Sequence, residues 1–476
     1  MRRPGTPTRA RLVLGLLLSA LVLSPAAGAT NWPAYLYGPT HHSFGPNATQ
    51  ITPVNAASLV RAWRFVADPP TQTGQPRGCC FASPTVFNGR IYIGANTGDF
   101  YALSLSTGAV IWKRFLGFVP ALTCGSRGFV STAAVARDPV TAEPTVYVTA
   151  PDGYLYALKA SDGSQVWRSP IAIPSDTVND YFNWSSPAVA NGRIFVGVSS
   201  QCDNPLVRGG VKAFAQTTGN PLATYYSVPE GSVGGSVWSS PAATVNRTTA
   251  NNVIAATGNG PSGGDTESVV RLDAQSLARQ EAWKVPTGEH VGDGDFGASP
   301  TVFAATLGGA RTQMVGDCNK NGIYYAFRLK NLAAGPVWRF RVSAGTGHGR
   351  LACLAAAVWN GSNLFVAGTS TTIGGTASKG SIRKLNPATG QPLWERPLSG
   401  AVIGSPSLNG AGVLAVATFD SSAGVTNAAY LVNASTGAVV KTLSTGGAQE
   451  FAQPVFVNQY VLLATAGNGL LAYKLP

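Results

Sequence analysis

Two carboxylates stand close together in the stretch GDGDFGASP, residues 292–300: Asp293 and Asp295, followed by Pro300. A carboxylate can accept a proton from a reacting hydroxyl, and a pair of them can supply hard oxygen ligands to a divalent cation. Asp and Gly are also the usual residues of exposed turns. The stretch alone is compatible with either a reactive site or a turn, so the elements that position it must decide.

Those elements form a repeat. The phrase GDFYALSLSTGAVIW at residues 98–112 returns as GYLYALKASDGSQVW at 153–167, and weaker copies follow at intervals of about 47 to 58 residues. A second phrase, of the type ASPTVFNGRIYIG, recurs at the same interval as the first and occurs eight times. Each unit alternates apolar and polar residues over short runs, with Asn-Gly pairs suited to hairpin turns. This pattern is typical of four-stranded propeller blades.

The composition supports the same fold class. Only 12% of the 476 residues are charged, 45% are hydrophobic, and Gly and Pro number 56 and 32. Such a chain builds short strands and tight turns. We therefore predict an all-β fold, a single eight-bladed β-propeller over residues 30–476. The C-terminal segment GLLAYKLP should pair with LVRAWRF, residues 59–65, because this pairing closes the ring and protects the sheet edges.

Residues 1–29 are predicted to be a secretory signal peptide. Arginines precede the apolar run LVLGLLLSALVL, and the small residues SPAAGAT follow it. The run is shorter than the roughly 20 residues that a membrane span requires. We expect the mature protein to be secreted or periplasmic.

The formal net charge is +13, but Lys and Arg are scattered along the chain. The charge favours an anionic small ligand, and no basic run interleaved with aromatic residues indicates nucleic-acid binding. Six cysteines in a secreted chain suggest disulfides. Cys79 and Cys80 are neighbours with Cα atoms about 3.8 Å apart, below the usual disulfide span, so a bond between them would be strained. We favour bonds to other cysteines, of which Cys80–Cys124 is one.

The blade phrase Y-A-L-x-x-x-x-G-x-x-x-W resembles the tryptophan-docking repeat of quinoprotein alcohol dehydrogenases. The opening NWPAYLYGPTHHSF and the later ITPVNAASLVRAWRF resemble the entry to those propellers, especially in relatives of polyvinyl-alcohol dehydrogenase. The resemblance covers essentially the whole mature chain. It implies a site on the propeller axis for pyrroloquinoline quinone (PQQ) and Ca²⁺, although scaffolding propellers carry similar blades.

The same resemblance assigns roles to the opening stretch. Family members carry an Asp-x-Asp before the first strand of a blade, with Pro seven residues after the first Asp, as in Asp293-Gly294-Asp295 and Pro300. It implies that Asp293 is the catalytic base and a metal ligand, and that Asp295 is a second carboxylate of the cofactor site. Asn259, in a segment similar to the family's T-G-N, is the implied amide ligand of calcium.

Three further residues are implied to hold the quinone. Trp238 matches the indole that stacks under the flat cofactor, although packing between blades is the alternative. Lys320, in CNKNGIYYAF, matches the catalytic cation near the quinone oxygens. Arg127, in CGSRGFVS, resembles the Arg-Gly pair that contacts a cofactor carboxylate, which suits the guanidinium fork.

The chain also departs from the family pattern. An adjacent-cysteine disulfide expected near residues 121–122 is absent, and Cys124 stands alone there. The family's third metal ligand, a glutamate upstream of an Arg-Gly, is missing too. Asp203 is the nearest substitute, with Asn204 beside it. The four histidines show no ligand spacing and are interpreted as structural or exposed, including His290 beside the Asp pair.

Two functions follow as expectations. The first is a PQQ- and calcium-dependent dehydrogenase that oxidises an alcohol, possibly polymeric or a sugar alcohol. Because the chain lacks the C-x-x-C-H motif of attached c-type haem, its electrons would pass to a separate acceptor such as a cytochrome c. The alternative is a non-catalytic scaffold or binding protein of the cell envelope.

Overall fold

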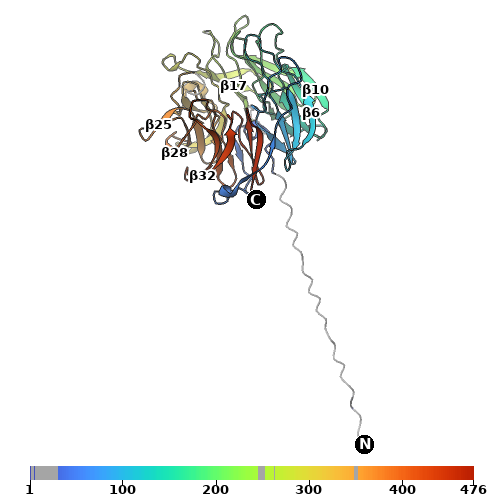
Figure 1. The fold of residues 1–476 in the computed structure, drawn as a ribbon. Coiled ribbons are helices and arrows are strands. Elements are labelled where there is room, and N and C mark those ends of the chain that lie inside the picture. Colours follow the sequence, from blue (N-terminus) through green and yellow to red (C-terminus); the bar gives the residue numbers. More distant parts are fainter. Residues whose placement is uncertain (2–4, 6–29, 245–251, 262, 348–351) are drawn as a thin grey trace.

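The protein is built from eight antiparallel blades arranged around an axis (Figure 1). The computed structural model describes the chain apart from residues 2–4, 6–29, 245–251, 262 and 348–351, so the predicted signal peptide lies outside the described residues. Seven sheets have four strands, and the seventh blade gains β1 as a fifth strand. The eight-bladed all-β prediction is confirmed.

The blades follow one another along the chain. Blade 1 contains β3 (Thr85–Phe87), β4 (Arg90–Gly94), β5 (Asp99–Ser104) and β6 (Val110–Phe115); blade 2 contains β7 (Ala134–Arg137), β8 (Pro144–Thr149), β9 (Tyr154–Lys159) and β10 (Gln165–Pro170); blade 3 contains β11 (Ala188–Ala190), β12 (Arg193–Val198), β13 (Gly210–Ala215) and β14 (Pro221–Tyr226); blade 4 contains β15 (Ala242–Thr244), β16 (Asn252–Ala256), β17 (Ser268–Asp273) and β18 (Arg279–Lys284). Blade 5 contains β19 (Thr301–Leu307), β20 (Ala310–Cys318), β21 (Ile323–Arg328) and β22 (Trp338–Arg341); blade 6 contains β23 (Val358–Trp359), β24 (Leu364–Gly368), β27 (Gly380–Leu385) and β28 (Pro392–Leu398), with the hairpin β25 (Thr371–Ile373) and β26 (Thr376–Ser378); blade 7 contains β29 (Ser407–Asn409), β30 (Val413–Ala417), β31 (Asn427–Asn433), β32 (Val439–Gly447) and β1 (Phe44–Gly45).

The ring closes in blade 8, which combines the two ends of the chain. The strands β33 (Val455–Val457), β34 (Tyr460–Thr465) and β35 (Gly469–Lys474) form its inner part, and β2 (Val60–Phe65) is its outer strand. β2 pairs antiparallel with β35, from Val60 opposite Lys474 to Phe65 opposite Leu470. The predicted closing pair is confirmed, and in Figure 1 blue and red strands meet there.

Tryptophans of the outer strands dock each blade onto the next. The Trp112 indole on β6 donates from Nε1 to the Ala160 carbonyl of blade 2 at 3.2 Å. A Cβ on Gly163 would lie 2.6 Å from the Trp112 ring, and this residue has φ +71°, so only glycine fits the turn. Trp63, Trp338 and Trp394 make equivalent bonds to the following blade. The G and W of the repeated phrase are therefore two halves of one contact.

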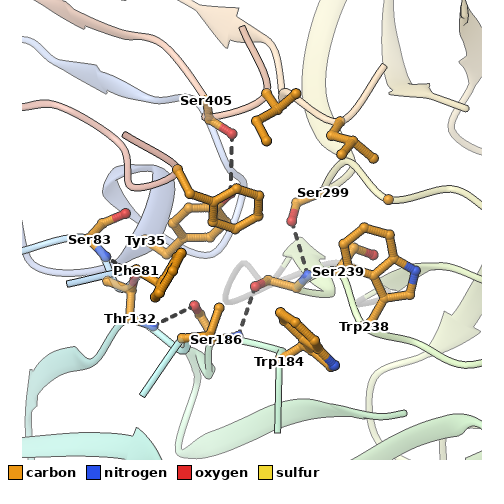
Figure 2. Close-up of a pocket in the computed structure, with 16 residues that line it drawn as sticks. Tyr35, Phe81, Ser83, Thr132, Trp184, Ser186, Trp238, Ser239, Ser299 and Ser405 are labelled. Atoms are coloured by element: carbon orange, nitrogen blue, oxygen red, sulfur yellow. Dashed lines mark hydrogen bonds between the residues drawn. The ribbon is translucent and has the colours of Figure 1, made fainter. Parts of the chain in front are cut away.

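The Ser-Pro phrase builds the wall of the central channel (Figure 2). Six backbone N–H groups each donate to a hydroxyl of the following blade at 2.8–3.0 Å: Ser83 to Thr132, Thr132 to Ser186, Ser186 to Ser240, Ser240 to Ser299, Ala356 to Ser405, and Gln453 to Ser83. These hydroxyls satisfy buried donors that the innermost strands leave unpaired. The repeat thereby ties neighbouring blades together at the axis.

An N-terminal segment crosses the ends of the innermost strands. Backbone bonds join Trp32 to Val86 of blade 1 and His42 to Trp359 of blade 6. Its short 3₁₀ turn η1 (Tyr35–Tyr37) places the Tyr35 side chain in the axial cavity, where its hydroxyl meets Ser405 Oγ at 3.1 Å. Other 3₁₀ turns are η2 (Ala56–Ser58), η3 (Thr287–Glu289) and η4 (Leu332–Ala334).

Candidate cofactor site

Five of the predicted site residues come from loops between strands of blades 3, 4 and 5. Asp293 and Asp295 lie between β18 and β19, Lys320 between β20 and β21, Asn259 between β16 and β17, and Trp238 between β14 and β15. Strands alternate in direction within each blade, so these loops emerge at the same end of the propeller. Loops held by a rigid scaffold in this way are the usual carriers of binding sites.

Asp295 forms hydrogen bonds with three of the other site residues. Its Oδ1 accepts the backbone N–H of Asn259 at 2.6 Å, and its Oδ2 accepts from Lys320 Nζ at 2.6 Å and Trp238 Nε1 at 3.2 Å. The Lys320 N–H also donates to the Asp295 carbonyl at 2.9 Å. With its side chain 6% exposed and both oxygens engaged, Asp295 holds the indole and the ammonium in place. It is suited to positioning these groups rather than to exchanging protons.

Asp293 is the more open carboxylate, with 30% of its side chain exposed. Its Oδ1 accepts from Lys320 Nζ at 2.6 Å. Burial raises the pKa of Asp293 above its ordinary value, and the charge of Asp295 raises it further, whereas Lys320 opposes both. A carboxylate with a raised pKa is a stronger proton acceptor once ionised, which suits a general base.

Lys320 is a buried cation between the two aspartates. Burial lowers the pKa of Lys320, but the charges of Asp295 and Asp293 outweigh that effect and the pKa is raised, so the ammonium stays protonated. Its Nζ lies 5.2 Å from the centroid of the Trp238 ring. Positive charge is thus concentrated beside an indole and a proton acceptor.

Trp238, Asp293, Asp295 and Lys320 line a pocket of about 230 Å³ together with Trp184 and residues 200–203. Trp184 was not predicted. Its sequence signal was present, however, because NWSSPAV at residues 183–189 repeats the VWSSPAA around Trp238 one blade later. The two indole rings meet edge to face, with centroids 6.3 Å apart. The Trp238 ring, with the Lys320 ammonium beside it, fits an electron-poor, anionic ring system such as PQQ.

The implied calcium ligands are only partly assembled. Asp203 lines the pocket with Asp293, and burial raises the pKa of Asp203 while the Ser200 hydroxyl, bonded to its Oδ1, opposes the shift. Asn259 approaches through its backbone N–H, which Asp295 holds. No group of three His, Cys, Asp or Glu side chains in the described residues is arranged to hold a metal. The carboxylate and amide oxygens of these residues are ligands of the kind that Ca²⁺ prefers. Their joint binding of Ca²⁺ is a proposal.

Arg127 lies behind the pocket wall. Its guanidinium stacks over the Trp184 ring, with Cζ 4.8 Å from the centroid, and it is absent from the residues lining the pocket. Burial lowers the pKa of Arg127, and this residue forms no ion pair within the described part of the chain. An uncompensated cation at this place favours negative charge on whatever fills the pocket.

His290 and His41, two of the three histidines that the structure describes, bond to neighbouring groups of the protein. His290 Nδ1 lies 2.7 Å from Glu267 Oε2 and its Nε2 lies 2.8 Å from the Val285 carbonyl. His41 is buried and bonded to the Pro300 carbonyl. His42 lies partly exposed, and His348 is outside the described residues.

The predicted cysteine pairing is wrong. The bonds are Cys79–Cys80, Cys124–Cys202 and Cys318–Cys353, so Cys80 does not reach Cys124. Cys79 and Cys80 lie in the core where blades 8 and 1 meet, whereas Cys124 lies in the loop between blades 1 and 2 and faces a loop of blade 3. Nothing in the local spacing indicated that contact, which spans 78 residues.

The Cys124–Cys202 bond ties together two loops beside the pocket. Gln201 Nε2 donates to the Gly125 carbonyl at 2.6 Å and Thr123 Oγ1 to the Asn204 carbonyl at 2.7 Å. The buried Asn179 side chain accepts the N–H groups of Leu122 and Cys124. The crosslink therefore stabilises the loops that carry Arg127 and Asp203.

Replacing both Cys124 and Cys202 by Ser is expected to lower the free energy of unfolding by about 2–4 kcal/mol, because the denatured chain loses a long-range constraint. Limited proteolysis should detect new cuts confined to residues 119–128 and 200–208. The matched control is the double variant Cys318→Ser/Cys353→Ser, which should leave those loops resistant. Unchanged cleavage of the first variant would contradict a clamping role.

Residues 32–259 match the family model described as glucose/ethanol/alcohol dehydrogenase, beta-propeller domain, and residues 328–475 match the model for outer membrane protein assembly factor BamB. The chain is similar to PQQ-type β-propellers over these two segments. Its TM-score against the quinohemoprotein alcohol dehydrogenase structure from Comamonas testosteroni is 0.72, at 17% identity, covering 94% of this chain and 80% of that one. The BamB structure from Moraxella catarrhalis gives 0.55 at 14% identity, covering 87% and 99%.

Curated relatives match only part of this chain. Quinohemoprotein alcohol dehydrogenase ADH-IIG of Pseudomonas putida is 28% identical over 228 residues, 47% of this chain and 29% of that protein. BamB of Legionella pneumophila is 25% identical over 143 residues, 29% and 36% of the two chains. The match therefore spans less than a third of the dehydrogenase relative's length. No helix of the described residues is long and apolar enough to cross a membrane.

Proposed function

We propose that this propeller binds PQQ in the pocket floored by Trp238 and oxidises an alcohol there, outside the cytoplasm. The observation that carries the proposal is the Asp293–Lys320–Asp295 cluster, whose Lys320 ammonium lies over the Trp238 ring. Asp293, Asp295 and Lys320 come from loops of blades 4 and 5, and all three line the pocket together with Trp238. A pure scaffold gains nothing from burying them, because burying charge is costly.

Each residue has a distinct task. Bound PQQ would supply the two-electron acceptor for the alcohol. Asp293 takes the hydroxyl proton, Lys320 stabilises negative charge at the ring edge, and Asp295 keeps Lys320 and Trp238 oriented. Asp293, Asp203 and Asn259 would hold Ca²⁺. A separate acceptor such as a cytochrome c would then receive the electrons.

A second candidate is a non-catalytic scaffold of the cell envelope. It is favoured by the match of residues 328–475 to the BamB model. That segment runs from the end of β21 in blade 5 to β35 in blade 8, whereas the charged cluster lies before it, at residues 293–320. The two candidates therefore draw on different parts of the ring and predict different ligands.

The deciding experiment titrates purified mature protein with PQQ, with and without Ca²⁺, and follows tryptophan fluorescence and dye-coupled alcohol oxidation. Calcium-dependent binding that is lost in Asp293→Ala and Asn259→Ala would support the dehydrogenase. Asp162→Ala, which removes a carboxylate from an exposed turn of blade 2, is the matched control and should bind normally. Absence of binding at micromolar PQQ would contradict the proposal and favour the second candidate, a non-catalytic scaffold.

A further inference from the structure

Trp184 separates two cavities of the propeller. It lines both the pocket of about 230 Å³ and the axial cavity of about 50 Å³ beneath it, and Trp238 is the other indole that lines both. Figure 2 shows the two side chains next to each other at the axis. Any molecule that rests on Trp238 from the pocket side therefore lies beside Trp184.

The Trp184 ring is held in one orientation before any ligand arrives. Its Nε1 donates to the Ser200 carbonyl at 3.0 Å. The Phe182 ring packs edge-on against it at 5.0 Å, and Arg127 covers the ring at 4.8 Å. Phe182 is 1% exposed, whereas Trp184 is only partly buried and keeps surface toward the pocket. A wall fixed in this way binds without an ordering cost.

The two indoles make a corner. Their planes cross at 68°, so a flat molecule lying on the face of one presents its edge to the other. Arg127 adds positive charge on the Trp184 side, without a carboxylate partner among the described residues to neutralise it. The corner thus suits a flat ring with negative charge along one edge.

We propose that Trp184 is a second ring-contacting residue of the site, which packs against the edge of a flat, electron-poor polycyclic acid resting on Trp238. Arg127, stacked on Trp184, favours the ionised carboxylates at that edge. The assignment rests on the proposed function, because PQQ is such an acid. Trp184 would thus determine specificity together with Trp238, the indole that was predicted from the sequence.

The test compares dissociation constants for two probes: PQQ, and its trimethyl ester, which has the same rings without the carboxylate charge. Trp184→Leu should weaken both probes by about tenfold, because a ring contact is lost. Trp184→Phe should recover part of the affinity for both. Arg127→Gln should weaken PQQ and leave the ester unchanged.

The matched control is Trp394→Leu, which removes another partly buried indole with a bond to a backbone carbonyl, far from the pocket on blade 6. It should bind both probes as the wild type does. Wild-type affinity for both probes in Trp184→Leu would overturn the assignment while the proposed function stands. Failure of the wild type to bind either probe would overturn both.

A structure of the wild-type protein with PQQ provides a readout that needs no variant to fold. A ring edge within about 4 Å of the Trp184 side chain is the expected result. A ring bound away from Trp184, with intervening solvent or with its edge against other residues, would overturn the assignment.

Discussion

Asp293→Asn is expected to lower kcat for alcohol oxidation by about 10²–10⁴-fold while the Kd for PQQ changes little. The amide cannot accept the hydroxyl proton, although its oxygen can still accept a hydrogen bond from Lys320. Asp295 cannot substitute, because its side chain is 6% exposed and both oxygens already bind Lys320, Trp238 and Asn259. Steady-state kinetics of the PQQ-loaded protein measures the effect.

The pH profile gives a second signature of the same base. Because burial and the charge of Asp295 raise the pKa of Asp293, wild-type kcat/KM should rise with pH through a midpoint above the ordinary aspartate value. This rise of kcat/KM with pH should be absent in the Asp293→Asn variant. Retention of wild-type kcat in that variant would remove Asp293 from the reaction.

Asp295→Asn serves as the comparison. Its effect should be on Kd and stability, because this residue orients Trp238 and Lys320. Equal loss of kcat with unchanged Kd in both variants would contradict the division of roles.

Lys320→Met is expected to lower the free energy of unfolding by about 3–5 kcal/mol, because it leaves two neighbouring carboxylates buried without their cation. The pKa of Asp293 should rise further, since Lys320 opposes the present shift. A group whose pKa is raised by folding contributes most stability below its unfolded pKa. The variant should therefore lose stability as pH rises from about 4 toward neutrality.

Denaturant unfolding between pH 4 and 7 measures this difference. Lys212→Met is the matched control: Lys212 is partly buried and donates to the Ile171 carbonyl, and it forms no ion pair with the described residues. It should lose less stability and show no such pH dependence. A Lys320→Met variant as stable as the control at neutral pH would show that the cluster is not electrostatically coupled.

Much of the fold followed from periodicity. Alternating strands, Asn-Gly turns and the recurring G and W specify blades, since each outer-strand tryptophan must meet a glycine turn of the next blade, as Trp112 meets Gly163. The closing pair of β2 and β35 was predictable because an eighth unit lacked an outer strand of its own. These are local or nearest-neighbour relations, and spacing along the chain encodes them.

The composition of the candidate site was also partly predictable. Resemblance pointed to Asp293, Lys320 and Trp238, and the structure brings all three together with Asp295. The resemblance also implied different roles for Asp293 and Asp295, whereas the groups that bind each oxygen of Asp295 could be seen only in the structure. Asn259 faces the cluster through its backbone, which no motif could reveal.

The sequence by itself therefore determined the blade count, the ring closure and the loops that carry charge. Only the tertiary structure decided the Cys124–Cys202 bond, the place of Arg127 behind Trp184, and the 68° angle between the Trp184 and Trp238 rings. Each of these joins residues from different blades that meet only where the loops converge near the axis. Such contacts depend on the curvature of the whole ring, to which every blade contributes, so no local spacing along the chain can specify them.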